Sequence, residues 1–305
     1  MRRIAEIIEA ARAAGPLKVA VAAAQEESAL EAAVDAYKHG IAVPILVGDI
    51  AAMRGIAAAL GLDLSPFELV EEKEPAKAAA KAVELVKTGK ADMLMKGIVD
   101  TSVILKAALN KETGINSGRL ASHVAVMESE HYHKLFLVTD AAINIAPDIP
   151  AKVDIISNAV EACVALGVAL PKVALLAAME KVNWEKMPCT ADAAIITQMN
   201  RRGQIKGCLV DGPLALDNAV SAESAKIKKI SSEVAGDADI LVTPDIEAGN
   251  VLYKSLLDLG GAKGAGIVMG ASRPIVLTSR ADTAETKLAS IAFASLVARA
   301  RSGRN

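Results

Sequence analysis

Short apolar runs rich in β-branched residues recur along the whole chain, and longer stretches with helical spacing separate most of them. This alternation is typical of βα units, in which helices connect parallel strands. It predicts an α/β fold with a largely parallel sheet. The predicted strands lie at residues 18–22, 44–47, 67–70, 92–95, 123–127, 135–138, 173–177, 207–210, 239–242, 266–269 and 274–278.

The chain is long enough for two lobes, because 305 residues with 52% hydrophobic positions can bury two moderate cores. Two closely spaced strands between residues 123 and 138 interrupt the alternation and give the best interior boundary. A second pair of closely spaced strands near the C-terminus indicates another crossover. We therefore expect a first α/β lobe of residues 1–134 plus 273–305, and a second lobe of residues 135–272.

Composition narrows the possible functions. Aromatic residues make up only 2% of the chain and the formal net charge is −2, which argues against a nucleic-acid or anionic-membrane partner. The basic N-terminus runs directly into an amphipathic pattern, and no stretch is long enough to span a membrane, so we expect a cytoplasmic protein. Cys163, Cys189 and Cys208 are widely spaced, so we expect reduced thiols and no metal site.

The stretch from Pro274 to Glu285 is the most informative for chemistry, because an apolar strand ends in polar residues and a helix follows. Ligand sites in parallel sheets lie at such strand ends. The Ser279 hydroxyl, the Arg280 guanidinium and the free N–H groups of the next helix could face one anion. Alternatively, Asp282 and Glu285 form an ordinary capping box.

Three further polar segments follow predicted strands. In residues 95–102 a strand ends at Lys96 and a helix begins near Thr101, and Lys106 follows on that helix. Lys96 and Lys106 could form a phosphate-binding wall. Residues 210–218 contain Asp211, Gly212 and Pro213, and residues 243–250 contain several carboxylates. The alternative for these two segments is a turn or a helix cap, with Asp217 or Asn218 as the cap in the first.

Other features favour structural roles. The glycine-rich residues 260–266 match neither the dinucleotide fingerprint nor the Walker pattern and are interpreted as a flexible turn. His131 and His133 lack a third metal ligand nearby, so a solvated loop is favoured over a metal site. His123 begins an apolar strand and is interpreted as a core or boundary histidine.

Taken together and in order, these segments resemble the phosphate acetyl/butyryltransferase family over nearly the whole chain. The resemblance rests on residues 95–97, 139–144, 211–213, 244–250 and 278–282, and residues 217–221 and 246–254 are closer to the butyryl branch. It implies two lobes like those of isocitrate and isopropylmalate dehydrogenases, with the active site in the cleft, and a homo-oligomer. It also implies reversible transfer of a short acyl group between CoA and inorganic phosphate in butyrate metabolism.

The resemblance also implies roles for individual residues. Ser279 and Arg280 match the family's active-site serine and arginine, and the acidic residue downstream falls at Asp282 or Glu285. Lys106 stands where the acetyl branch has an arginine. The candidate substrate-binding residues are Lys96, Gly97, Thr101, Lys106, Asp140, Asn144, Asp211, Gly212, Pro213, Glu247 and Asn250.

The expected ligands are small molecules, an acyl-CoA thioester and phosphate, with no tightly bound cofactor. An enzyme of the acetyl branch is the nearest alternative. A metal-dependent enzyme on the related dehydrogenase scaffold would need a nucleotide site that the sequence does not contain. A non-catalytic acyl-CoA-binding protein is the remaining alternative, and a lack of turnover would distinguish it.

Overall fold

The computed structural model describes residues 1–278 and 282–303. Contacts within the chain divide it into two units. We call Met1–Ile4 with Ser122–Gly264 the central unit, and Ala5–Ala121 with Ala265–Asn305 the terminal unit. The lobe boundaries expected from the sequence stay a prediction. No helix within residues 1–278 and 282–303 is both long and apolar enough to cross a membrane.

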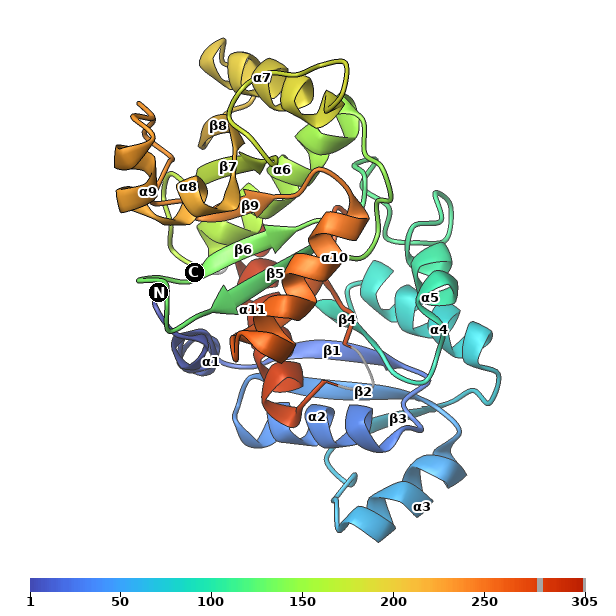
Figure 1. Cartoon of the computed structure of the whole chain (residues 1–305). Helices are drawn as coiled ribbons and strands as arrows, with labels where there is room; N and C mark the ends of the chain where they lie inside the picture. The colour runs from blue at the N-terminus through green and yellow to red at the C-terminus, as the bar shows by residue number, and fades with distance from the viewer. Residues whose placement is uncertain (279–281, 304–305) are drawn as a thin grey trace. The chain divides into compact units, whose positions relative to one another are not determined.

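The terminal unit is built on a mostly parallel sheet with the strand order β3-β2-β1-β4-β11-β10. Figure 1 labels β1 to β4 of this sheet. Every neighbouring pair in this part of the sheet is parallel except β10 with β11. Its elements are α1 (Ile4–Ala14), β1 (Leu17–Ala22), α2 (Glu27–Lys38), β2 (Ala42–Gly48), α3 (Ile50–Leu60), β3 (Glu68–Glu71), α4 (Pro75–Lys87), β4 (Met93–Lys96), α5 (Thr101–Ala108), β10 (Lys263–Met269), β11 (Ile275–Val276) and α11 (Ala284–Ser302).

The central unit has the strand order β5-β6-β9-β7-β8. The pair β5–β6 is antiparallel and the other neighbours are parallel. Its elements are β5 (Ser122–Glu128), β6 (Phe136–Thr139), α6 (Ile149–Ala165), β7 (Lys172–Leu176), α7 (Pro188–Arg201), β8 (Leu209–Leu214), α8 (Leu216–Val220), α9 (Ala222–Ile227), β9 (Ile240–Val242), α10 (Ile246–Lys254) and the π-helical turn η1 (Ser255–Leu259).

The α/β fold class is confirmed, and each predicted apolar run overlaps a strand. Two local expectations are wrong. Asp211, Gly212 and Pro213 lie within β8 and not in a turn after it. The glycine-rich stretch is only partly a turn, because β10 already begins at Lys263. Glycine and proline favour turns locally, but pairing of β8 with β7 overrides that preference.

Small residues allow the helices to pack closely on the sheet. The buried positions of α2 are Ala29, Leu30, Ala32, Ala33, Val34 and Ala36. The inner face of α4 is similar, with Ala78, Ala79 and Ala82 beside Val83 and Val86. Because alanine adds little bulk, such faces bring helix and sheet backbones near each other. This explains how a chain with 2% aromatic residues still forms well-filled cores.

Candidate active site

Asp140 directly follows β6 at the carboxyl edge of the central unit's parallel strands. Its side chain is 3% exposed. One carboxylate oxygen accepts the backbone N–H groups of Ala142 at 2.9 Å and Ile143 at 3.1 Å. The other accepts the Asn144 backbone N–H at 3.2 Å and the Asn144 side-chain amide at 2.6 Å. Asp140 therefore shapes its own loop, and it brings the predicted residue Asn144 to the same edge.

The segment after β9 packs against this loop, since β9 is parallel to β6. The Asn250 amide donates to the Ala141 carbonyl at 3.0 Å, and the Thr243 hydroxyl lies 3.2 Å from the Asp140 carbonyl. A Cβ at Gly249 would lie 2.3 Å from the same carbonyl, so only glycine fits there. The structure thus brings Asp140, Asn144 and Asn250 together, and their role in binding a ligand stays a prediction.

Glu247 lies in the first turn of α10, close to this site in the chain, and is exposed. The cap of α10 is Asp245, which accepts the Ala248 backbone N–H at 2.8 Å. Helix capping and ligand binding, the two interpretations of the segment that follows β9, therefore apply to different residues. Asp245 is occupied in capping, and the exposed Glu247 carboxylate stays a candidate for ligand contact.

The predicted residues Asp211, Gly212 and Pro213 lie on β8, which β7 separates from β9. Gly212 is required by packing: a Cβ there would lie 2.7 Å from the Cβ of Leu175. Asp211 accepts the Gly212 backbone N–H at 2.9 Å. The role of this segment in a ligand site stays a prediction.

A charged cluster beyond the carboxyl ends of β7 and β8 was missed in part by sequence reasoning. Lys228 lies 3.2 Å from the Glu180 carboxylate and 3.1 Å from that of Asp217. Its ammonium group holds the pKa of Asp217 below the usual range. The Asn218 side chain is fully buried and donates to Glu180. The idea that Asp217 or Asn218 caps a helix is wrong, because the cap of α8 is Ala215.

In the terminal unit, Lys96 ends β4 and Gly97 follows at the carboxyl edge. The Gly97 N–H donates to the Ala22 carbonyl at 2.8 Å, and a Cβ on Gly97 would lie 2.3 Å from the Ala23 oxygen. This close approach requires glycine and brings the ends of β1 and β4 together. As predicted, α5 begins at Thr101, and Thr101 and Lys106 are both exposed.

Strand β11 pairs in parallel with β4, with Val276 opposite Met95, so the chain leaves β11 at the same edge as Lys96. Ser279 and Arg280 come next in the sequence and lie outside the described residues. The capping reading of Asp282 is wrong. The cap of α11 is Thr283, whose hydroxyl accepts the Thr286 backbone N–H at 3.2 Å.

The three thiols and His123 fit structural roles. All three cysteines are free in the structure. Burial raises the pKa of Cys208 to about 11 and also raises the pKa of Cys163 and Cys189, which disfavours the nucleophilic thiolate. His123 is 6% exposed and packs edge-on against Tyr253, in agreement with the core reading.

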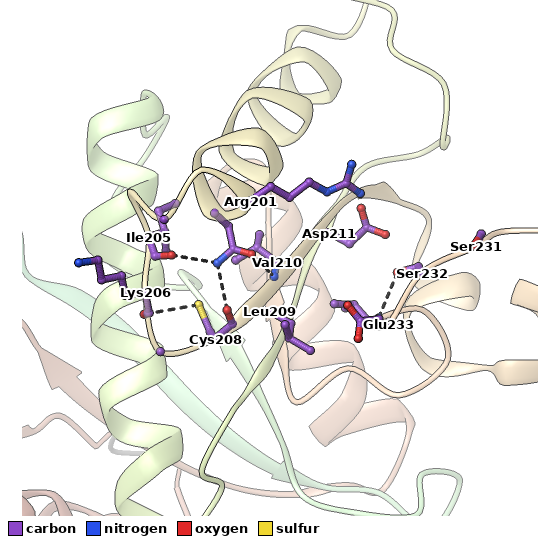
Figure 2. Close-up of a pocket in the computed structure, with 14 residues that line it drawn as sticks. Arg201, Ile205, Lys206, Cys208, Leu209, Val210, Asp211, Ser231, Ser232 and Glu233 are labelled. Atoms are coloured by element: carbon purple, nitrogen blue, oxygen red, sulfur yellow. Dashed lines mark hydrogen bonds between the residues drawn. The ribbon is translucent and has the colours of Figure 1, made fainter.

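A cavity of about 680 Å³ lies at the amino end of β8, the end opposite to the carboxyl edge of the sheet (Figure 2). The loop before β9 and the end of α7 line it, and Arg201 extends over it toward Asp211 in the view. The side-chain amide of Asn200 donates to the Cys208 carbonyl at 3.0 Å and accepts the Val210 N–H at 3.1 Å. Asn200 thus covers the free edge of β8 as a neighbouring strand would. Of the predicted substrate-binding residues, Asp211 lines this cavity.

Both units carry polar loops at the carboxyl edge of their parallel strands. This is where α/β enzymes bind their ligands. The chain belongs to the phosphate acetyl/butyryl transferase family, whose pattern matches residues 3–79 and 72–295. It is therefore an acyltransferase.

Individual relatives cover almost the whole chain. A phosphate butyryltransferase of Clostridium acetobutylicum is 53% identical over 293 residues, which are 96% of this chain and 97% of the relative. A phosphate acetyltransferase of Rhizobium meliloti is 46% identical over 97% of this chain and 93% of its own length. The crystal structure of a branched-chain phosphotransacylase from Enterococcus faecalis V583 has a TM-score of 0.81 at 36% identity. It covers 92% of this chain and 99% of the other.

Proposed function

We propose that this acyltransferase moves a short acyl group, with butyryl preferred, between CoA and inorganic phosphate. The observation that carries the proposal is the 53% identity to a phosphate butyryltransferase over 96% of the chain. The preference for butyryl over acetyl also draws support from the segments at residues 217–221 and 246–254, which resemble the butyryl branch. The relative that is a phosphate acetyltransferase makes acetyl transfer the second candidate.

In the forward reaction a phosphate oxygen attacks the thioester carbonyl carbon. The new C–O bond forms as the C–S bond breaks, which gives acyl phosphate and the CoA thiolate. The proton lost from phosphate ends on the sulfur. No covalent enzyme intermediate is required, so the main task of the protein is positioning, which contributes about 7–11 kcal/mol when both reactants are held in attack geometry.

We assign phosphate binding to Arg280, whose guanidinium matches two phosphate oxygens at once. We assign to Ser279 a hydrogen bond to the developing oxyanion or to the sulfur, worth about 3 kcal/mol. Asp282 or Glu285 carries the proton. These roles are supported by the order of the segments in the sequence, and by the exit of β11 at the edge where Lys96 lies. Lys96, Gly97, Thr101 and Lys106 would complete a phosphate-binding wall.

The loops of the central unit are proposed to contact the CoA thioester. Asn144, Glu247 and Asn250 lie in two segments that hydrogen bonds hold together at one strand edge, which supports a shared ligand role. A homo-oligomeric state and a cytoplasmic location remain part of this proposal. Light scattering of the purified protein tests the first, and fractionation of the source cells tests the second.

The deciding assay follows CoA release from acetyl-, propionyl-, butyryl- and isobutyryl-CoA with phosphate, with and without a chelator. We expect kcat/KM to be highest for butyryl-CoA and unaffected by chelation. A maximum at acetyl-CoA would replace the butyryl assignment by the acetyl one. No CoA release from any of the four thioesters would overturn the enzymatic proposal.

Variants of Arg280 test its role. Arg280→Lys keeps the charge but loses the two-pronged geometry, so the KM for phosphate should rise about 10-fold or more. Arg54→Lys, at an exposed position on α3, is the matched control and should leave both KM values unchanged. If a folded Arg280→Lys enzyme kept the wild-type KM for phosphate, the assignment of Arg280 would be withdrawn.

A further inference from the structure

Trp184 is the single tryptophan of the chain, and it is 67% exposed. It lies on the loop between β7 and α7, beyond the carboxyl end of β7. Val182 on the same loop is 52% exposed. A large apolar ring that is exposed to water does not contribute the burial free energy that such side chains normally contribute to folding. The loop therefore offers a flat aromatic surface at the edge of the sheet where ligand sites form.

The loop is fixed by several hydrogen bonds around Asn183. Its backbone N–H donates to the Thr190 hydroxyl at 2.8 Å, its carbonyl accepts the Met187 N–H at 2.8 Å, and its side-chain oxygen accepts the Lys186 N–H at 3.2 Å. These bonds tie the loop to the first turn of α7. Trp184 is thus presented from a defined turn, so a ligand that stacks on it meets a surface ordered in advance.

The loop of Trp184 and the segment bridged to it carry more unpaired exposed lysines than unpaired exposed carboxylates. The bridge of 3.2 Å between Lys228 and Glu180 brings the segment after α9 next to this loop. Within residues 177–187 and 222–230, four exposed lysines make no ion pair: Lys181 and Lys186 on the loop, Lys226 in α9 and Lys229 after it. Two exposed carboxylates in the same ranges, Glu185 and Glu223, also make none. An anionic ligand with an aromatic ring fits this combination.

We propose that Trp184 stacks on the adenine ring of the acyl-CoA substrate, with the neighbouring lysines attracting its phosphate groups. The inference rests on the proposed function, because CoA is the ligand of that reaction that carries both a planar base and several phosphates. Trp184 then sets affinity for the nucleotide end of CoA and takes no part in acyl transfer.

Intrinsic fluorescence tests this contact directly, because Trp184 is the only tryptophan present. Titration with CoA or with adenosine 3′,5′-bisphosphate should change the emission in a saturable way. Pantetheine lacks the base and the phosphates and should have no effect. Emission that does not respond to CoA, at concentrations that saturate turnover, would overturn the inference.

Kinetics give the second test. Trp184→Ala should raise the KM for butyryl-CoA about 10-fold, a typical loss for one base–aromatic stack, and leave kcat unchanged. The KM for butyryl-pantetheine should not change, and Trp184→Phe should restore part of the affinity. The matched control is Leu170→Ala, at a residue 52% exposed just before the amino end of β7, and it should behave as wild type.

The outcomes separate this inference from the proposed function. An active enzyme whose KM for butyryl-CoA is unchanged in Trp184→Ala refutes only the stacking. An enzyme inactive with every acyl-CoA, but with emission quenched by CoA and not by pantetheine, refutes the function and retains the stacking. A fall in molecular mass of Trp184→Ala without a change in KM would show that this surface contacts a second copy of the chain instead.

Discussion

Substitution of Gly249 by alanine tests the contact that holds the two central-unit loops together. Gly249 lies in α10 and is buried. A Cβ there would be 2.3 Å from the Asp140 carbonyl oxygen, 2.7 Å from the Thr243 hydroxyl and 3.1 Å from the Ala141 Cα. Two of these three atoms belong to backbone, so no side-chain rotation relieves the clash. The helix must move away from the loop.

The size of the effect follows from two opposing contributions. Overpacking a close contact costs about 1–3 kcal/mol. Alanine in a helix interior returns about 0.5–1 kcal/mol relative to glycine. We expect Gly249→Ala to destabilise α10 by up to about 2.5 kcal/mol overall. Because Asn250 bonds to the Ala141 carbonyl, the displacement should also raise the KM for the acyl-CoA.

The matched control is Gly55→Ala in α3, another glycine within a helix, where a Cβ would meet nothing within 4 Å. Its expected effect is a gain of about 0.5–1 kcal/mol, from helix propensity alone. Hydrogen exchange measured by mass spectrometry reports the local opening free energy of α10 and α3 separately. Slower exchange of α10 in Gly249→Ala, with unchanged kinetics, would refute the argument that glycine is required there.

Two further predictions concern a helix cap and an ion network. Thr283→Ala should lower the free energy of unfolding by about 1 kcal/mol, and Asp282→Asn should lower it by less. Urea titration measures both changes. An inactive but fully stable Asp282→Asn enzyme would identify Asp282 as the proton carrier. Burial acts to raise the pKa of Asp237, but hydrogen bonds with Lys172 and Lys134 and their charges hold the pKa well below its usual value of 3.8. The stabilisation is therefore present above pH 3.8 and lost as the pH falls toward the folded-state pKa. Asp237→Asn should lower the free energy of unfolding by about 1 kcal/mol near pH 7. The value is small because the side chain is 41% exposed and screened by water. A stability difference from wild type that does not shrink in acid would contradict this linkage.

The fold could be predicted from the sequence because its strands are short, apolar and buried, and the stretches between them have a different period. A buried parallel strand needs little beyond this pattern, and β1 is an example, with a single exposed position at Lys18. Strand ends were less predictable. Pairing with β7 continues β8 through Asp211, Gly212 and Pro213, residues that locally favour a turn.

Long-range contacts account for the parts of the site that the sequence did not predict. The ion pair of Lys228 with Glu180 joins residues 48 positions apart, and no local sequence pattern around either residue predicts it. The requirement for glycine at position 249 depends on a carbonyl at residue 140, which only the pairing of β6 with β9 brings near. Local rules also misplaced the cap of α11 by one residue, since both Asp282 and Thr283 suit that position.

The geometry of Asp140 distinguishes a loop-shaping carboxylate from one that is available to a substrate. A carboxylate offers about four lone-pair sites, and Asp140 receives three backbone N–H groups and the amide of Asn144. Its acceptor capacity is therefore filled by residues of its own loop. A substrate contact in this segment would come more readily from backbone groups or from Asn144 than from the Asp140 oxygens. By contrast, Glu247 is exposed at the start of α10, where the neighbouring Asp245 already caps the helix, so its carboxylate is the better candidate in the central unit for direct contact with a ligand.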